Sequence, residues 1–287
     1  MMLSVLFLVF LAHSVECGSG TVVKASYELQ SLINTLWKED TNRLVFGKDI
    51  RLNYQNQASW STARDVSYKP LFYSVNTNVF SKPTFRAFIA LLDNYESDTY
   101  SRESVPTSEV NENYYFLNEV LKTNAMKKVH EYLRRKNKAP YSSSQFKSAL
   151  YDLWFQMYYR SSVRGSSGFE HVFVGETKSD GQVSGFHNWI QFYLEEKNRN
   201  LNYYGYLKKS SSSPYLSIVK YTWQKKIKHI GSSFYGTSPE FEFALYSLVY
   251  MMGYERLQFS LDGMQVKITC FGMNRNRNIG TCYPDLV

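Results

Sequence analysis

Two of the five histidines, His171 and His187, lie on either side of a hairpin signal. The side chains between them alternate in character, and Asp180 and Gly181 form a dipeptide typical of a tight turn. With these two residues as the loop, His187 lies opposite Val174, about three positions or roughly 10 Å along the strand from His171. The two imidazoles can then converge, and converging imidazoles can donate and accept protons in a reaction.

His187 is expected to be the proton-accepting member of this pair. A helical pattern through Trp189, Ile190, Tyr193 and Leu194 follows it, which predicts that His187 lies in or near the first turn of a helix. The positive end of the helix dipole would lower the pKa of His187 and favour its neutral form. A single histidine is more often a core or surface residue than a catalytic one. The catalytic interpretation therefore depends on the convergence of the two.

Glu170 and Glu176 are the carboxylates nearest to His171 along the chain. Side chains alternate between the two faces of a regular strand. Glu170 and Glu176 are an even number of positions apart but an odd number from His171, so they would point to the opposite face. That orientation disfavours direct proton transfer. They could instead bind a hard metal ion, orient a histidine through its second ring nitrogen, or simply face solvent. The residues alone favour exposure to solvent, and the sequence offers no cluster with the usual spacing of metal ligands.

The elements that must position these residues indicate an α+β fold, in which a helical first part precedes a mixed part with antiparallel sheets. Apolar residues recur at helical spacing in four places, at residues 29–37, 85–92, 117–121 and 146–157. A polar stretch with Pro140, at residues 136–145, marks the expected internal boundary. Strand patterns dominate after it.

A predicted strand over residues 216–223 and a polar turn precede Lys228. A well-marked helix start follows, because Ser238 is a good N-cap and Pro239 suits the first helical position. The apolar face of this helix indicates a scaffold. We expect it to fix a loop over residues 228–236 against the core.

Cys270 and Cys282 flank a polar, turn-like stretch at residues 274–280. Two strands of a hairpin could bring the cysteines together as a disulfide in an oxidising compartment. Two unpaired buried thiols are the alternative. Alternation through residues 266–270 and a short final strand at 281–283 support the hairpin.

Residues 1–17 have the pattern of a signal peptide, with an apolar run followed by small residues, although no Lys or Arg precedes the run. Cleavage after Ser14 or Cys17 would release the chain into the secretory pathway. The run is too short to cross a bilayer, which takes about 20 apolar residues, and no later stretch is long or apolar enough. We therefore expect a secreted protein without a stable membrane anchor.

The formal net charge of +8 favours an anionic partner such as nucleic acid, a glycosaminoglycan or a membrane surface. Basic residues gather at 127–138 and again at 225–228, and we expect the first group to be a solvated face. The 24 Tyr and 19 Phe could stack on bases, but core packing is the more ordinary use of such rings.

Several long segments resemble the EndoU family of poly(U)-specific endoribonucleases. They are SSGFEHVFVGE at 166–176, GFHNWIQFYLEEK at 185–197 and GTSPEFEFALYSL at 236–248, with TFRAFIALLDNYE at 84–96 and LWFQMYYR at 153–160. Motifs of this length in one order are far more specific than any short pattern. The resemblance implies one EndoU-like domain over 18–287, with a helical half at about 24–140 and a catalytic half at about 141–287.

The resemblance also implies which residues form the site. The catalytic residues would be His171, His187 and Lys228. Their supporting residues would be Glu170 and Glu176. By the same resemblance, which includes the coronavirus uridylate endoribonuclease, the residues that hold uracil would be Ser232, Thr281 and Tyr283.

The activity implied is cleavage of single-stranded, U-rich RNA by a secreted monomer. A neutral histidine, assigned as His187, would take the proton of a ribose 2′-hydroxyl, which attacks the adjacent phosphorus while a protonated His171 supplies the leaving 5′-oxygen. The products would be a 2′,3′-cyclic phosphate and a 5′-hydroxyl, with Lys228 neutralising charge in the transition state. Stimulation by Mn²⁺ is implied by the family alone, and its ligands are unknown.

Two other functions stay open at this point. One is a catalytically weak secreted protein of the same fold that binds RNA or a surface, and the intact His171, His187 and Lys228 argue against it. The other is a metal-dependent hydrolase using the two histidines with Glu170 and Glu176, which would leave linear phosphate ends.

Overall fold

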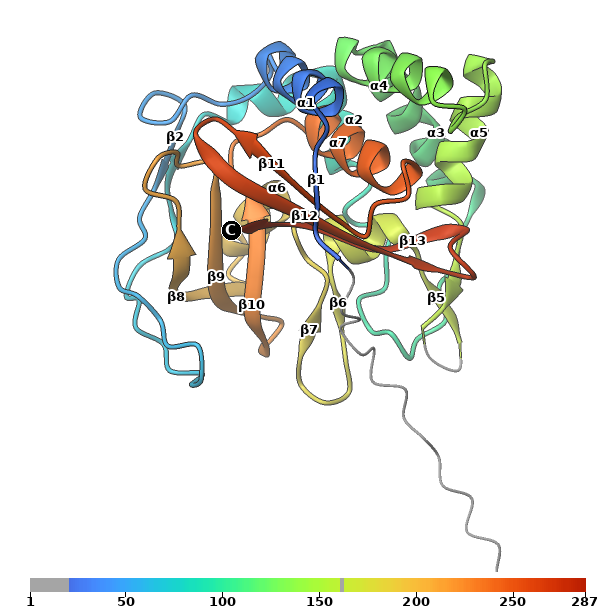
Figure 1. The fold of residues 1–287 in the computed structure, drawn as a ribbon. Coiled ribbons are helices and arrows are strands. Elements are labelled where there is room, and N and C mark those ends of the chain that lie inside the picture. Colours follow the sequence, from blue (N-terminus) through green and yellow to red (C-terminus); the bar gives the residue numbers. More distant parts are fainter. Residues whose placement is uncertain (1–20, 161–162) are drawn as a thin grey trace, which may run out of the picture.

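The computed structural model describes residues 21–160 and 163–287. The expected signal peptide at 1–17 lies outside these residues. The α+β fold is confirmed, since helices gather in the first half of the chain and antiparallel sheets in the second (Figure 1). Among the described residues, none of the helices has the length and apolar character that crossing a membrane requires.

Most of the helices occur where the sequence predicts them, and α4 is the one that it does not predict. In chain order they are α1 (Tyr27–Glu39), α2 (Pro83–Ile89), α3 (Thr107–Lys122), α4 (Asn124–Arg135), α5 (Ser143–Trp154), α6 (Trp189–Lys197) and α7 (Pro239–Met251), with a 3₁₀ turn η1 (Thr77–Ser81) and a π-helical turn η2 (Glu170–Val174). Four of them, α1, α2, α3 and α5, correspond to the four predicted apolar faces. The polar stretch around Pro140 is the connection between α4 and α5.

Two sheets carry most of the second half of the chain. One has the order β1-β11-β12-β13, formed by Val23–Lys24, Arg256–Leu261, Met264–Met273 and Asn278–Leu286. The other has the order β10-β9-β8, formed by Lys226–Phe234, Leu216–Trp223 and Leu201–Lys209. Three short ribbons pair β2 (Ile50–Leu52) with β3 (Phe72–Val75), β4 (Tyr158–Tyr159) with β5 (Arg164–Ser166), and β6 (Glu176–Thr177) with β7 (Val183–Ser184). Strands β10 and β9 contact β13, so the two sheets meet.

Helix α7 is the scaffold that the sequence predicts. The Ser238 hydroxyl accepts the Phe241 N–H at 3.2 Å, and Pro239 occupies the first turn. Helix α7 contacts α1, α2 and α4 on one side and β12 and β13 on the other. Its residues are buried almost all round, and Phe243 stacks on Trp154 with ring centroids 4.9 Å apart. The helical layer and the four-stranded sheet therefore share one core.

The first basic group lies on helix α4 and just after it, and its side chains are exposed or partly exposed, as expected for a solvated face. Arg135 and Lys136 form ion pairs with Glu28 of α1, and Lys128 contacts Glu39 at 3.4 Å. These side chains are partly exposed, so each pair adds little to stability. The opposite face of α4 packs into the core, and this burial stabilises the helix.

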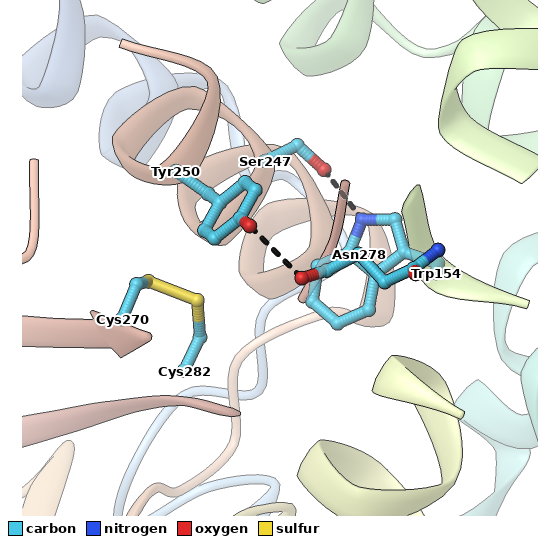
Figure 2. The surroundings of a disulfide bond; sticks show 6 residues. All are labelled: Trp154, Ser247, Tyr250, Cys270, Asn278 and Cys282. Carbon is cyan, nitrogen blue, oxygen red and sulfur yellow. Dashed lines mark hydrogen bonds between the residues drawn. A yellow bond between two sulfur atoms is a disulfide. The ribbon is translucent and has the colours of Figure 1, made fainter. Parts of the chain in front are cut away.

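The predicted disulfide is present between Cys270 and Cys282, which lie directly opposite each other on β12 and β13 (Figure 2). Close by, the Tyr250 hydroxyl of α7 donates to the Asn278 carbonyl oxygen at 2.9 Å. The Trp154 indole N–H donates to the Ser247 hydroxyl, also at 2.9 Å. Strand β13 is thus attached both to its neighbour and to the central helix.

Candidate functional site

His171 lies on the π-helical turn η2 and not on a strand. The predicted hairpin over residues 169–189 is wrong in this part, because only Glu176–Thr177 and Val183–Ser184 pair. Residues 170–174 are all buried, so they have no solvent-facing side and the two-residue alternation of a half-exposed strand does not apply. Gly175, with φ +101°, ends the turn before the short ribbon begins.

The two histidines nevertheless converge, as predicted. The Phe186 N–H donates to the His171 carbonyl at 2.9 Å, and the His187 N–H donates to the Val172 carbonyl at 2.7 Å. Gly185 permits this approach, since a Cβ at that position would lie 1.7 Å from the His171 carbonyl oxygen. Gly185 also has φ +62°, a conformation that glycine adopts without strain. The backbone therefore holds the two imidazole-bearing segments against each other.

Glu176 orients His171 through its second ring nitrogen. Oε2 of Glu176 lies 2.7 Å from Nδ1 of His171, while Oε1 forms an ion pair with the Arg160 Nε at 3.0 Å and accepts a hydrogen bond from the Ser166 hydroxyl. Although burial alone would raise it, the neighbouring His171 and Arg160 bring the pKa of Glu176 down to about 2. The expectation that Glu176 is solvated and faces away from His171 is wrong, because Gly175 redirects the chain between them.

Glu170 is also fully buried, so the expectation of a solvated side chain is wrong here too. Among the described residues neither of its carboxyl oxygens has a hydrogen-bond partner. Burial, and then the charge of Glu176, raise the pKa of Glu170 well above its usual value. The raised pKa favours the neutral form of Glu170, which is the first residue of the turn that carries His171.

His187 lies one residue before the N-cap of α6, close to where the sequence places it. Asn188 is that N-cap, and its side-chain oxygen accepts the Ile190 N–H at 2.9 Å. His187 is buried, and its Nδ1 lies 2.9 Å from the Ser232 carbonyl oxygen. Burial, and then the charge of Lys228, lower its pKa well below the usual value. The predicted direction of the shift agrees, and its largest cause is burial.

Lys228 lies on strand β10, opposite Tyr221 of β9, and its side chain is buried. The expected loop over residues 228–236 is instead a strand with a bulge between Lys228 and Gly231. Burial, and then the charge of Lys178, lower the pKa of Lys228 to about 7. Lys228 also contributes to the lowered pKa of both histidines, which places its charge near both rings.

The three residues expected to hold uracil lie on the two sheets where they meet. Ser232 is on β10 and binds His187 through its carbonyl oxygen, while Thr281 and Tyr283 are on β13. The Tyr283 ring stacks on the His187 ring, with centroids 5.0 Å apart and planes at 21°. The fold thus brings residues from β10 and β13 together with the histidine pair.

A protein cage for manganese does not fit this site. No group of three or more His, Cys, Asp or Glu side chains is arranged to hold a metal ion in residues 21–160 and 163–287. Both oxygens of Glu176 are occupied by Arg160, Ser166 and His171. Glu170 is a single buried carboxyl.

The arrangement suits proton transfer beside a cation. Each imidazole has an acceptor at Nδ1, which leaves Nε2 as the reactive nitrogen of both rings. The acceptor is a carboxylate for His171 and a neutral carbonyl for His187, so a protonated ring is stabilised better at His171 than at His187. The sequence does not single out Arg160 and Ser166, which hold Glu176, since only the resemblance of the 153–160 and 166–176 segments touches them.

Comparison with known proteins matches the chain to one family along most of its length. A family profile described as Endoribonuclease XendoU covers residues 28–284. Poly(U)-specific endoribonuclease-B of Xenopus laevis is 42% identical over 286 residues, which cover 95% of this chain and 97% of that protein. Uridylate-specific endoribonuclease B of Danio rerio is 45% identical over 269 residues, covering 90% and 95%. The solved structure of XendoU, a splicing independent snoRNA processing endoribonuclease, superposes with a TM-score of 0.80 at 40% identity, covering 93% of this chain and 99% of that one.

Proposed function

The chain belongs to the endoribonuclease XendoU family, and we propose that it cleaves single-stranded RNA at uridylates by attack of the ribose 2′-hydroxyl. The observation that carries this proposal is the pair of buried imidazoles, His171 and His187, which have different Nδ1 acceptors and whose pKa values are both lowered by the charge of the buried Lys228. The names of the relatives in Xenopus laevis and Danio rerio support RNA as the substrate and uridylate as the base.

His187 acts as the general base in this proposal. The Ser232 carbonyl accepts from Nδ1–H, so Nε2 carries the lone pair that takes the 2′-hydroxyl proton. The lowered pKa of His187, caused first by burial and then by Lys228, keeps the ring neutral near pH 7. The oxygen freed of its proton attacks the adjacent phosphorus and forms the cyclic phosphate.

His171 acts as the general acid, because a carboxylate partner stabilises an imidazolium better than a carbonyl does. In the free protein, burial and then Arg160 lower the pKa of His171 to about 4. A phosphate anion would favour the charged ring again, so His171 takes up its proton as RNA binds. Calorimetry with a non-cleavable 2′-deoxyuridine strand in buffers of different ionisation enthalpy measures this proton. Binding without proton uptake would contradict the assignment.

Lys228 stabilises the charge that develops on the phosphoryl oxygens. The low dielectric of a buried position strengthens this interaction relative to an exposed lysine. Uracil is held where β10 meets β13, by Ser232, Thr281 and the Tyr283 ring that stacks on His187. A pocket of hydrogen-bonding groups and one ring suits a pyrimidine better than a purine.

Stimulation by manganese is proposed to act through the phosphates of the RNA. The described side chains offer no group of three ligands, and the oxygens of Glu176 are already engaged. Thermal unfolding of the protein alone, with increasing Mn²⁺, should therefore show no saturable rise in Tm. A saturable rise without RNA would place the ion on the protein and contradict this proposal.

The chain is further proposed to be secreted as a monomer after removal of residues 1–17. The disulfide between Cys270 and Cys282 supports an oxidising compartment. Expression in animal cells, with N-terminal sequencing and light scattering of the protein from the medium, tests both statements. Retention inside the cell with an intact Met1 would contradict secretion.

The experiment that tests the proposed activity uses a quenched fluorescent oligonucleotide with one uridine. The parent, His187→Ala and His229→Ala are compared. His229 is exposed on the same strand as Lys228 and is a matched control for the loss of an imidazole. We expect His187→Ala to lose about a hundredfold to ten-thousandfold in rate and His229→Ala to stay near the parent. Equal rates for the parent and His187→Ala would contradict the proposal, and an inactive parent would favour the RNA-binding alternative.

A further inference from the structure

Arg160 connects three elements of the site through one guanidinium group. Its Nε–H donates to the Ser166 hydroxyl at 3.0 Å, and the same nitrogen forms an ion pair with Oε1 of Glu176, also at 3.0 Å. Its Nη2 donates to the Tyr158 hydroxyl at 2.9 Å and to the Gly280 carbonyl oxygen. The side chain is only 19% exposed, so these contacts form largely away from water.

The partners of Arg160 belong to two parts of the proposed site, the proton-donating pair and the uracil-binding strand. Glu176 is the residue that orients His171. Gly280 immediately precedes Thr281 on β13, the strand that also carries Tyr283. Among the described residues, Arg160 is the only lysine or arginine that forms an ion pair with Glu176.

We propose that Arg160 is a positioning residue that holds the proton-donating pair, His171 and Glu176, in register with the uracil-binding strand β13. This inference rests on the proposed function and adds a residue to it. Arg160 itself is not placed against the reacting atoms. It acts through Glu176 on catalysis and through the Gly280 main chain on base selection.

The geometry needs an arginine because the two contacts point in different directions. A guanidinium is planar and presents N–H donors along separate edges, so one group can serve both Glu176 and Gly280. The ammonium of a lysine is a single compact donor centre on a flexible chain, and it cannot keep both partners at the same spacing. Arg160→Lys therefore keeps the charge but separates the two functions.

The charge of Arg160 also reaches His171. Four charged or titratable groups act on this ring. They are Arg160 just after β4, Lys228 on β10, Glu176 on β6 and His187 just before α6. Burial and then Arg160 lower the pKa of His171, while Glu176 raises it. Removing the guanidinium removes a lowering influence and leaves the Glu176 charge less balanced. Both changes raise the pKa of His171 in Arg160→Gln.

The test compares the parent, Arg160→Gln, Arg160→Lys and Arg164→Gln. Arg164 is exposed, lies four positions away and donates to the Met157 carbonyl, so its variant controls for loss of one surface charge near the site. Two quantities are measured on the intact, mature chain. One is the pKa of His171 by NMR titration of its ring, and the other is the ratio of cleavage at a single uridine to cleavage at a single cytidine.

For Arg160→Gln we expect a higher pKa of His171, a kcat lower by about tenfold to a hundredfold and a reduced uridine preference. For Arg160→Lys we expect a pKa near that of the parent with the same reduced preference. Arg164→Gln should match the parent in all three. If Arg160→Gln does not fold, the proposal is decided by the uridine preference of Arg160→Lys.

A parental pKa of His171 together with a parental uridine preference, in the variants that fold, would overturn the proposal. If the parent itself does not cleave RNA, the proposed function fails, and the pKa of His171 still decides whether Arg160 acts on this ring. A purely structural role would lower the folded fraction and leave both quantities unchanged, which is the overturning result.

Discussion

His171 and Glu176 are joined by a contact of 2.7 Å between Nδ1 and Oε2, and the carboxylate is wholly buried. The burial matters because a carboxylate away from water keeps its charge only when its partners are correctly placed. Here they are His171, Arg160 and the Ser166 hydroxyl. The imidazole is therefore fixed in one orientation, with Nε2 turned away from the carboxylate.

Glu176→Gln should lower kcat by about a hundredfold, because a neutral amide cannot stabilise the imidazolium of His171 and leaves the Arg160 charge unpaired. Glu131→Gln, an exposed position on α4, removes the same charge far from the core and should leave kcat near the parental value. Single-turnover cleavage of a uridine-containing strand measures both. A Glu176→Gln enzyme with parental kcat would show that His171 does not depend on this carboxylate.

Gly185→Ala should inactivate the protein. The new Cβ would lie 1.7 Å from the His171 carbonyl oxygen, at a position with φ +62°, so the two histidine segments must separate. Gly181→Ala is the matched control, since its φ of +80° is comparable but no atom lies within 4 Å of the added Cβ. Relative to Gly181→Ala, we expect a further loss of at least about a hundredfold in cleavage rate. Similar rates in the two variants would mean that the close approach is not required.

Much of the fold could be predicted from local patterns in the sequence. Helices α1 and α7 follow from apolar spacing and from caps such as Ser238, which are encoded within a few residues. The disulfide follows from the hairpin around residues 274–280. In each case neighbouring residues contain the whole signal.

The parts that were not predicted depend on contacts between distant segments. The turn at residues 170–174 is buried on every side, so its apolar residues do not distinguish a strand from a helical turn. Gly175 then changes the direction of the chain, which brings Glu176 to His171. In a regular strand these two side chains would point to opposite faces. Arg160 has its partner Gly280 far along the chain, and no local pattern indicates such a pair.

The pKa of Lys228 predicts how activity depends on pH. This lysine is charged below about pH 7 and neutral above it in the free protein, because burial lowers its pKa from 10.5 to about 7. The acid His171 already makes kcat/KM fall as the pH rises above about 4, and since the charged lysine stabilises the transition state, its loss should steepen this fall by about a further tenfold per unit beyond about pH 7. Lys228→Arg stays charged in this range and should lack the steepening. The same slope of kcat/KM against pH in the parent and in Lys228→Arg, up to about pH 9, would contradict the role of Lys228.

Tyr283 is expected to have two effects, since its ring stacks on His187 and lies in the proposed uracil pocket. Tyr283→Ala should lower cleavage at uridine by roughly tenfold or more and should also lower cleavage at cytidine. Ser232→Ala keeps the carbonyl that binds His187, so it should mainly narrow the gap between uridine and cytidine. The measurement uses oligonucleotides with a single U, C, A or G ribonucleotide in DNA. Unchanged selectivity in both variants would exclude this pocket.

The central claim is that a 2′-hydroxyl attacks the phosphorus while two imidazoles exchange protons with the reacting oxygens. The direct measurement is mass spectrometry of the products from a strand with one ribouridine, beside the same strand with 2′-deoxyuridine. We predict a 2′,3′-cyclic phosphate and a 5′-hydroxyl from the first strand and no cleavage of the second. Cleavage of the deoxyuridine strand, or linear phosphate ends formed without a cyclic intermediate, would contradict the claim and favour a metal-dependent hydrolase.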